Sequence, residues 1–131
     1  DTHMLQVSAA IIRNAKGQIL VCRRGLGGNC AYLWGFPGGK QEPSESPEEC
    51  LMRECQEELG IEIVVEGLYE RFSYAYPDKT IDFHFFNAHI AKGSPEIRVH
   101  SEIKWVSPQE LIPEDFCPAD VTMVRQLRDQ N

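Results

Sequence analysis

The chain has 131 residues, of which 42% are hydrophobic and 25% are charged. This length and balance suit one folded domain with a buried core, and they exclude a disordered or fibrous chain. The formal net charge of −7 also excludes the basic face that binds a nucleic-acid duplex or a membrane surface. We expect a single domain over residues 4–131, and we interpret residues 1–3 as a cloning scar.

The five cysteines are odd in number and show no CxxC spacing. This pattern disfavours a disulfide framework or a zinc site, and it favours a reducing compartment with buried, inert thiols. No apolar run approaches the roughly 20 residues of a membrane-spanning helix, and no signal peptide is visible. We therefore expect a cytoplasmic protein, either a monomer or a homodimer.

The N-terminal third predicts two strands, over residues 5–13 and 18–23, which are rich in β-branched and small apolar residues. The turn sequence at residues 14–17 lies between them, so we expect a hairpin. A short apolar run at residues 32–36 follows a glycine-rich loop and is halted by Pro-Gly-Gly at residues 37–39.

A central helix is predicted between Ser46 and Gly60. Ser46 suits the N-cap, Pro47 suits the first helical position, and Glu49 completes a capping box three residues after the cap. Gly60 is the glycine that commonly follows a helix. Apolar residues recur every four positions and predict the buried stripe, formed by Leu51, Cys55 and Leu59.

The C-terminal half predicts three more strands, over residues 61–76, 80–90 and 103–106. A turn at residues 77–79 joins the first two of these strands. A second capping-box sequence at residues 107–110 predicts a short helix, and a last helix is expected from about 119 to 130. The order of strands, helix, strands and helix predicts one layered α/β (α+β) domain.

The central helix is unusually acidic, with five glutamates: Glu48, Glu49, Glu54, Glu57 and Glu58. An exposed acidic face is common and alone indicates only a solvated surface. Residues 54, 57 and 58, however, share one face beside the apolar stripe, because they are three and four positions apart. Carboxylates clustered in this way suit Mg²⁺ or Mn²⁺.

The loop before the helix supports an anionic ligand. Gly38 and Gly39 allow backbone to approach a ligand closely, and Lys40 adds a cation that suits a phosphate. The N-terminus of the helix adds the positive end of its dipole.

Gly39, Glu45 and the run from Arg53 to Ile61 together resemble the Nudix box. Every charged and glycine position matches, and only Cys55 departs from the usual Ile, Leu or Val. The resemblance implies a Nudix-type α/β/α sandwich with a mixed β-sheet, a catalytic helix and a C-terminal helix. It also implies an enzyme that hydrolyses a nucleoside diphosphate linked to another group with the help of Mg²⁺.

The same resemblance implies a metal ligand set, formed by the Gly38 carbonyl and the carboxylates of Glu54, Glu57 and Glu58. Either Glu54 or Glu58 would take the proton of the attacking water, and the sequence leaves this choice open. Arg53 is the other catalytic candidate, and we expect it to orient Glu45 or Glu57 by a salt bridge.

The chain is most similar to the MutT-like branch of that family, through segments 22–24, 34–40 and 116–120. That similarity implies hydrolysis of a (deoxy)nucleoside triphosphate, such as 8-oxo-dGTP, CTP or dCTP, to the monophosphate and pyrophosphate. The candidate substrate-binding residues are Arg24, Phe36, Lys40, Tyr76, Asp78 and Asp120. Asp120 would accept hydrogen bonds from the base, or else only complement a helix N-terminus; Arg24 would contact substrate or remain a solvated strand end.

Two alternatives accompany this prediction. A Nudix hydrolase of another linkage, such as ADP-ribose, is the first, and a non-catalytic binding module that keeps the fold is the second. One departure from many MutT-like relatives is Val99, which stands where they carry a further glutamate. Glu96, His100 and Glu102 lie nearby in sequence, but the sequence does not assign any of them as a substitute.

Overall fold

The computed structural model describes residues 4–28 and 30–130, so the interpretation of residues 1–3 lies outside the described residues. The strands are β1 (Met4–Ile12), β2 (Ile19–Arg23), β3 (Trp34–Gly35), β4 (Gly38–Lys40), β5 (Glu62–Ala75), β6 (Thr80–Lys92) and β7 (Glu102–Val106). The helices are α1 (Pro47–Leu59) and α2 (Val121–Asp129), and three short 3₁₀ helices precede α2: η1 (Pro108–Glu110), η2 (Pro113–Asp115) and η3 (Pro118–Asp120).

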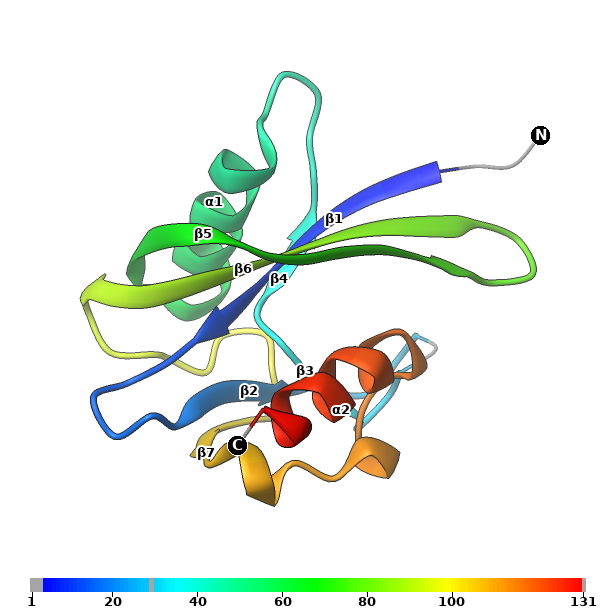
Figure 1. The fold of residues 1–131 in the computed structure, drawn as a ribbon. Helices are drawn as coiled ribbons and strands as arrows, with labels where there is room; N and C mark the ends of the chain where they lie inside the picture. Colours follow the sequence, from blue (N-terminus) through cyan, green and yellow to red (C-terminus); the bar gives the residue numbers. More distant parts are fainter. Residues whose placement is uncertain (1–3, 29, 131) are drawn as a thin grey trace.

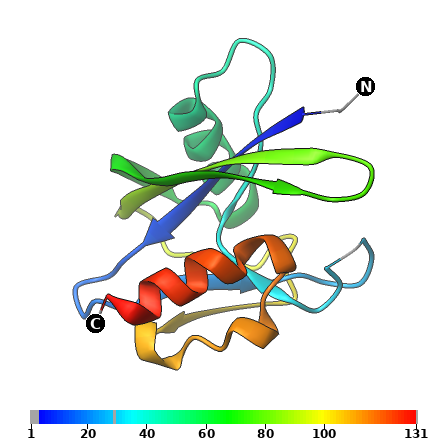
Figure 2. The same cartoon turned by 45° about the vertical axis from the view of Figure 1, so that its right-hand side comes forward.

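The strands form a mixed sheet of order β4-β1-β6-β5 and a smaller sheet of order β3-β2-β7. Strand β1 runs parallel to β6 and antiparallel to β4. Figures 1 and 2 show α1 beside the larger sheet and α2 beside the smaller one. The expected layered fold, with a mixed sheet, a central helix and a C-terminal helix, is confirmed.

The hydrophobic core divides into two clusters because successive side chains of a strand point to opposite faces. Ala10 and Ile12 of β1 join a cluster with Leu51 and Leu59 of α1. Their neighbours in β1, by contrast, join a cluster with α2, whose buried side chains are Met123, Val124 and Leu127. The two helices therefore cover opposite faces of β1, which makes an α/β/α sandwich.

The predicted hairpin between the first two strands is wrong. The turn forms as expected, with Gly17 at a φ of 76° and its N–H bonded to the Asn14 carbonyl at 3.0 Å. Beyond the isolated bridge of Arg13 with Ile19, however, β1 and β2 belong to different sheets. The physical reason is that β4 and β6 already pair with the two edges of β1.

Helix α1 begins and ends where the sequence predicts. The Ser46 hydroxyl accepts the Glu49 N–H at 3.1 Å, and the Glu49 carboxylate accepts the Ser46 N–H at 2.8 Å. Gly60 closes the helix in the left-handed conformation, with a φ of 68°. The predicted stripe is fully buried, and Cys50 joins it.

Strands β5 and β6 form the predicted antiparallel hairpin, and its turn is closed by the Tyr76 N–H bonded to the Lys79 carbonyl at 2.7 Å. The hairpin runs along β1 between α1 and α2, and its turn extends away from α1 on the side where β1 begins (Figure 1). Further along the chain, the expected short helix is the single turn η1, and η3 takes up the start of the expected last helix. None of the helices in the described part of the chain is long and apolar enough to cross a membrane.

Candidate active site

A cavity of about 430 Å³ lies between the larger sheet, α1 and the segments that precede β3 and α2. It brings together residues that are far apart in the chain. The predicted site residues that line it are Arg24, Phe36, Gly38, Lys40, Glu58, Tyr76 and Asp120. These seven positions come from five separate segments, so the fold itself assembles the pocket.

Four predicted site residues do not line this cavity. Glu54, Glu57 and Arg53 lie on α1 beside it, in a cluster described below. Asp78 lies exposed in the turn between β5 and β6, outside the lining, whereas the neighbouring Lys79 is part of the wall. The structure therefore does not bring Asp78 to the pocket.

The two glycines before α1 permit a close approach between β4, β1 and α1. A methyl group on Gly38, which has a φ of 154°, would lie 2.0 Å from the Ser8 carbonyl oxygen. A methyl group on Gly39 would lie 2.3 Å from the carboxyl carbon of Glu54. Glycine at Gly38 is thus required for β4 to lie against the backbone of β1, and Gly39 leaves room for the Glu54 carboxylate where it lies.

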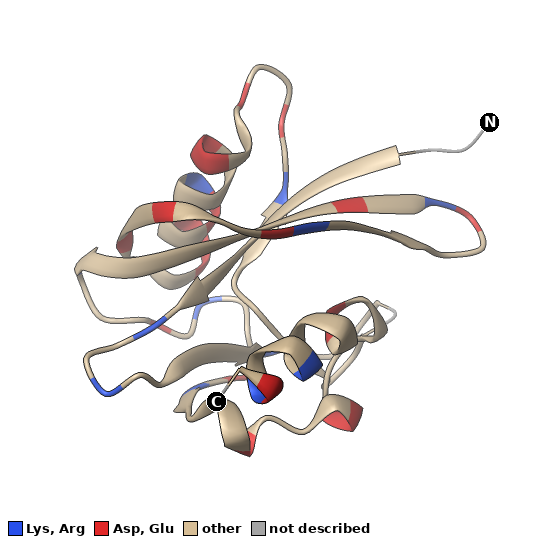
Figure 3. Cartoon of the chain, in the orientation of Figure 1, with Lys and Arg blue, Asp and Glu red and all other residues tan. Residues whose placement is uncertain are grey.

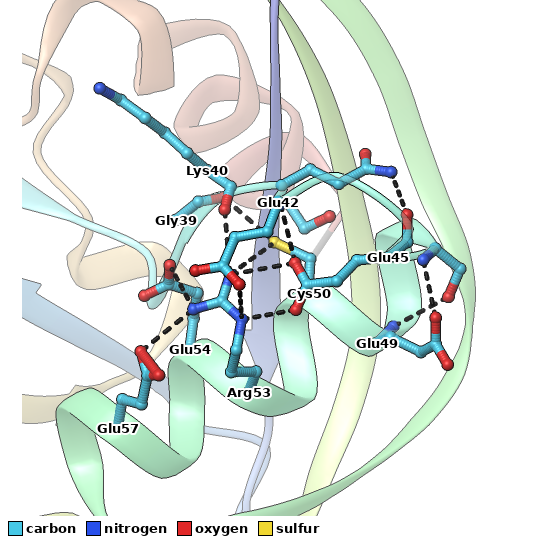
Figure 4. Close-up of polar contacts among 12 residues, drawn as sticks. Gly39, Lys40, Glu42, Glu45, Glu49, Cys50, Arg53, Glu54 and Glu57 are labelled. Atoms are coloured by element: carbon cyan, nitrogen blue, oxygen red, sulfur yellow. Dashed lines mark hydrogen bonds and ion pairs between the residues drawn. The ribbon is translucent and has the colours of Figure 1, made fainter.

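Arg53 organises the acidic side chains of α1 and of the loop before it (Figure 4). Its guanidinium donates to Glu45 at 2.5 and 3.1 Å, to Glu54 at 3.2 Å and to Glu57 at 3.0 Å. It also donates to the Lys40 carbonyl at 3.1 Å. The ion pairs that the sequence predicts for Arg53 with Glu45 and Glu57 are present, and Arg53 holds Glu54 as well.

Acidic residues gather along α1 and the loop before it, as Figure 3 shows. Burial, reinforced by the nearby charge of Glu54, raises the pKa of Glu58 to about 7. Burial also raises the pKa of Glu54, although Arg53 opposes this effect. By contrast, the hydrogen bond from Arg53 lowers the pKa of Glu45. Burial therefore disfavours the ionised form of both Glu58 and Glu54.

This donor set fits a divalent cation. Among the described residues, no three His, Cys, Asp or Glu side chains already converge as a ligand group, because Arg53 holds Glu54 and Glu57. The available donors are nonetheless carboxylate and backbone oxygens, which suit Mg²⁺ and Mn²⁺. A cation would also offset the charge of Glu54, which adds to the larger effect of burial in raising the pKa of Glu58.

Part of the cavity lining is aromatic, because Phe36 and Tyr76 both belong to it. Phe36 packs edge-on against Phe85, with ring centroids 5.9 Å apart. Asp120 belongs to the same lining, and burial raises its pKa to about 7 against the opposing effect of Arg24. Aromatic rings together with one half-buried carboxyl group suit the recognition of a flat ring that bears polar edges.

The cavity also includes residues that were not predicted as site residues from the sequence. Lys79 lines the wall with its ammonium nitrogen 5.6 Å from the Tyr76 ring centroid, and its place beside that tyrosine was the available signal. Cys117 belongs to the segment that carries Asp120. His100 reaches the cavity from the loop before β7; the sequence identifies it only as a neighbour of Val99 and does not assign it a role.

Comparisons with known proteins agree with this geometry. The 8-oxo-dGTP diphosphatase of Haemophilus influenzae is 39% identical over 130 residues, which cover 99% of this chain and 96% of that protein. The CTP pyrophosphohydrolase of Escherichia coli is 35% identical over 121 residues, which cover 92% and 89%. The solution structure of the E. coli ORF135 protein superposes with a TM-score of 0.81 at 34% identity, covering 95% of this chain and 88% of that one.

A profile of the NUDIX domain matches residues 2–127, nearly the whole chain. The match includes the glycine turn, Arg53 and the glutamates of α1, which are the residues that carry the resemblance in sequence. With this match and relatives at 39% and 35% identity along almost their full lengths, the chain belongs to the NUDIX domain family.

Proposed function

We propose that this protein hydrolyses a nucleoside or deoxynucleoside triphosphate to the monophosphate and pyrophosphate, with Mg²⁺ or Mn²⁺ as cofactor. One observation carries the proposal: a single cavity is lined by Glu58 of the acidic helix α1, by the aromatic rings of Phe36 and Tyr76, and by Asp120. The acidic lining suits a polyphosphate bound through cations, and the aromatic lining suits a base. Relatives named 8-oxo-dGTP diphosphatase and CTP pyrophosphohydrolase support this substrate class.

Enzymes of this family generally use a divalent metal ion. In this chain Glu54, Glu57, Glu58 and the Gly38 carbonyl would hold it. When bound, such an ion neutralises phosphate charge, polarises phosphorus and lowers the pKa of the attacking water. This explains how a protein with a formal net charge of −7 can bind a polyanion.

The roles of the other charged residues follow from where they lie relative to the cavity. Arg53 orients Glu54 and Glu57 through its ion pairs and does not line the cavity, so it is a positioning residue. Lys40 and Arg24 line the cavity as cations for the phosphate chain. Glu54 and Glu58 are both candidates to take the proton of the attacking water, because burial raises the pKa of each.

We assign recognition of the base to the aromatic part of the cavity lining. Phe36 and Tyr76 would enclose the ring, and the Asp120 carboxyl group would accept a hydrogen bond from a ring N–H or an amino group. The alternative of an ADP-ribose hydrolase differs at the far end of the substrate, because ADP-ribose also carries a base but has a second ribose in place of a terminal phosphate.

A substrate panel tests the proposal. We expect kcat/KM with Mg²⁺ to be highest for one of 8-oxo-dGTP, dCTP and CTP, and lower by at least about tenfold, or about 1.4 kcal/mol, for ADP-ribose. Asp120→Ala should lower kcat/KM for the preferred nucleotide, while Asp78→Ala, a matched change outside the cavity, should leave it within about twofold. A preference for ADP-ribose, or equal losses in both variants, would contradict the assignment.

A further inference from the structure

The last turn of α1 carries Glu57 and Glu58, and it ends against the loop of residues 93–101 between β6 and β7. The final carbonyls of an α-helix have no partner in a following turn and depend on groups beyond the helix. Here the Arg98 guanidinium donates to the carbonyls of Gln56 and Glu57 at 3.1 and 3.3 Å. Arg98 therefore completes the turn that holds two of the proposed metal ligands.

A second residue of the loop fixes it to the same helix end. The Glu96 N–H donates to the Leu59 carbonyl at 2.9 Å, while the Glu96 carboxylate accepts a hydrogen bond from Nε of Arg98 at 3.1 Å. The fit is close, because a methyl group on Gly60 would lie 2.6 Å from a guanidinium nitrogen of Arg98. Glu96 thus holds the guanidinium in the orientation in which it reaches the helix carbonyls.

The other end of the loop is fixed beside the cavity. The Ser101 N–H donates to the Arg23 carbonyl at 2.9 Å, and the Ser101 hydroxyl donates to the Arg24 carbonyl at 3.1 Å. Arg24 and Glu58 line the same cavity. Burial raises the pKa of Glu58, and the positive charge of Arg24 opposes this rise. The loop therefore connects the last turn of α1 to a residue whose charge acts on Glu58.

We propose that Arg98 is a positioning residue for the carboxylates of Glu57 and Glu58. The inference rests on the proposed function, because it concerns the same metal-binding helix. Helix ends open more easily than helix centres, and an open last turn would let both carboxylates move away from the Gly38 carbonyl and from Arg24. By binding the final carbonyls, Arg98 keeps this turn closed before any metal ion binds, so less ordering has to accompany binding.

Hydrogen exchange of the full chain without metal tests whether Arg98 keeps the last turn closed. In Arg98→Ala, the amides of Leu59 and Gly60 should exchange at least about fivefold faster, while amides in the middle of α1 should not change. Arg98→Lys keeps a positively charged donor and should restore part of the protection. Arg125→Ala removes an exposed arginine of α2 outside the cavity and should leave exchange in α1 unchanged.

Steady-state kinetics, measured well below the melting temperature of every variant, separate positioning from a purely stabilising role. In Arg98→Ala, the Mg²⁺ concentration for half-maximal rate should rise by at least about fivefold, and kcat should fall by a similar factor. The KM for the nucleotide at saturating Mg²⁺ should stay within about twofold, because the lining around the base is unchanged. Arg98→Lys should recover part of the loss, and Arg125→Ala should behave as the wild type.

The outcomes separate the two proposals. Faster exchange at Leu59 and Gly60 with an unchanged Mg²⁺ dependence would show that Arg98 only stabilises the helix, which overturns the inference and leaves the proposed function standing. A wild-type protein that hydrolyses no nucleoside triphosphate would overturn the proposed function and the inference that rests on it. If Arg98→Ala does not fold, Glu96→Ala releases the guanidinium but keeps the N–H bond to Leu59. It should then show the same changes at smaller size, and an unchanged Mg²⁺ dependence would contradict the inference.

Discussion

Asp120 shows how the environment of one residue sets its chemistry. Burial raises its pKa from the usual value near 4 to about 7, although the charge of Arg24 opposes this. A carboxyl group that is neutral near pH 7 both donates and accepts hydrogen bonds, whereas a carboxylate only accepts. Asp120 therefore offers a base both a hydrogen-bond donor and acceptors below about pH 7, and only acceptors above it.

The same shift predicts a dependence of stability on pH. Because the pKa of Asp120 is higher in the folded state, its contribution to stability is fully present below about pH 4 and is lost as the pH rises through about 7. The three pH units between these values correspond to at most about 4 kcal/mol. Asp120→Asn, which is neutral and of the same size, should thus be more stable than the wild type at pH 8 by at least about 1 kcal/mol, and this advantage should disappear at pH 4.

Urea unfolding of both proteins at pH 4, 6 and 8 measures this difference. Asp115→Asn, at an exposed position outside the cavity, is the matched control and should show no comparable trend. A difference between Asp120→Asn and the wild type that is the same at all three pH values would show that Asp120 does not titrate near neutrality.

At the scale of elements, α1 was predictable because its signals are local. Ser46, Glu49 and Gly60 mark both of its ends, and the four-residue spacing of its apolar stripe identifies its buried face. The acidic face could be predicted for the same reason, because residues three and four positions apart share a side of any helix. The contact of Arg53 with Glu54 depends on the side-chain conformations of two adjacent residues, and the sequence predicted a salt bridge only with Glu45 or Glu57.

The capping box of α1 predicts a measurable loss of stability when Ser46 is replaced. Ser46→Ala removes the hydroxyl that accepts the Glu49 N–H at 3.1 Å, and it should lower the free energy of unfolding by about 1 kcal/mol. Ser73→Ala, at an exposed position in β5, should change it by less than about 0.5 kcal/mol. Urea unfolding measures both values. Equal effects of the two substitutions would show that the cap does not stabilise α1.

At the scale of the whole molecule, local sequence signals were not sufficient to predict which strands pair and which residues meet in the cavity. The turn at Gly17 was predictable, but the pairing of β1 was not, because β1 pairs with β4 and with β6, which lie far along the chain. The place of His100 in the cavity could not be predicted either. Its loop is held by hydrogen bonds to backbone carbonyls, which every residue has, so no residue type in the sequence indicates these bonds. Asp78 shows the opposite case, since its neighbours Tyr76 and Lys79 reach the cavity and it does not.

The assembled molecule places a polyanion site and a base slot in one cavity, and the account depends on the bond that is cut between them. Product analysis by ³¹P nuclear magnetic resonance, with Mg²⁺ and the preferred triphosphate, measures this most directly. We predict the nucleoside monophosphate and pyrophosphate, no orthophosphate, and a kcat lower by at least about 10³ in Glu57→Gln or Glu58→Gln, which corresponds to about 4 kcal/mol. Glu48→Gln, in the first turn of α1, should retain wild-type turnover. Orthophosphate as the first product, or near-normal turnover in both Glu57→Gln and Glu58→Gln, would contradict the account.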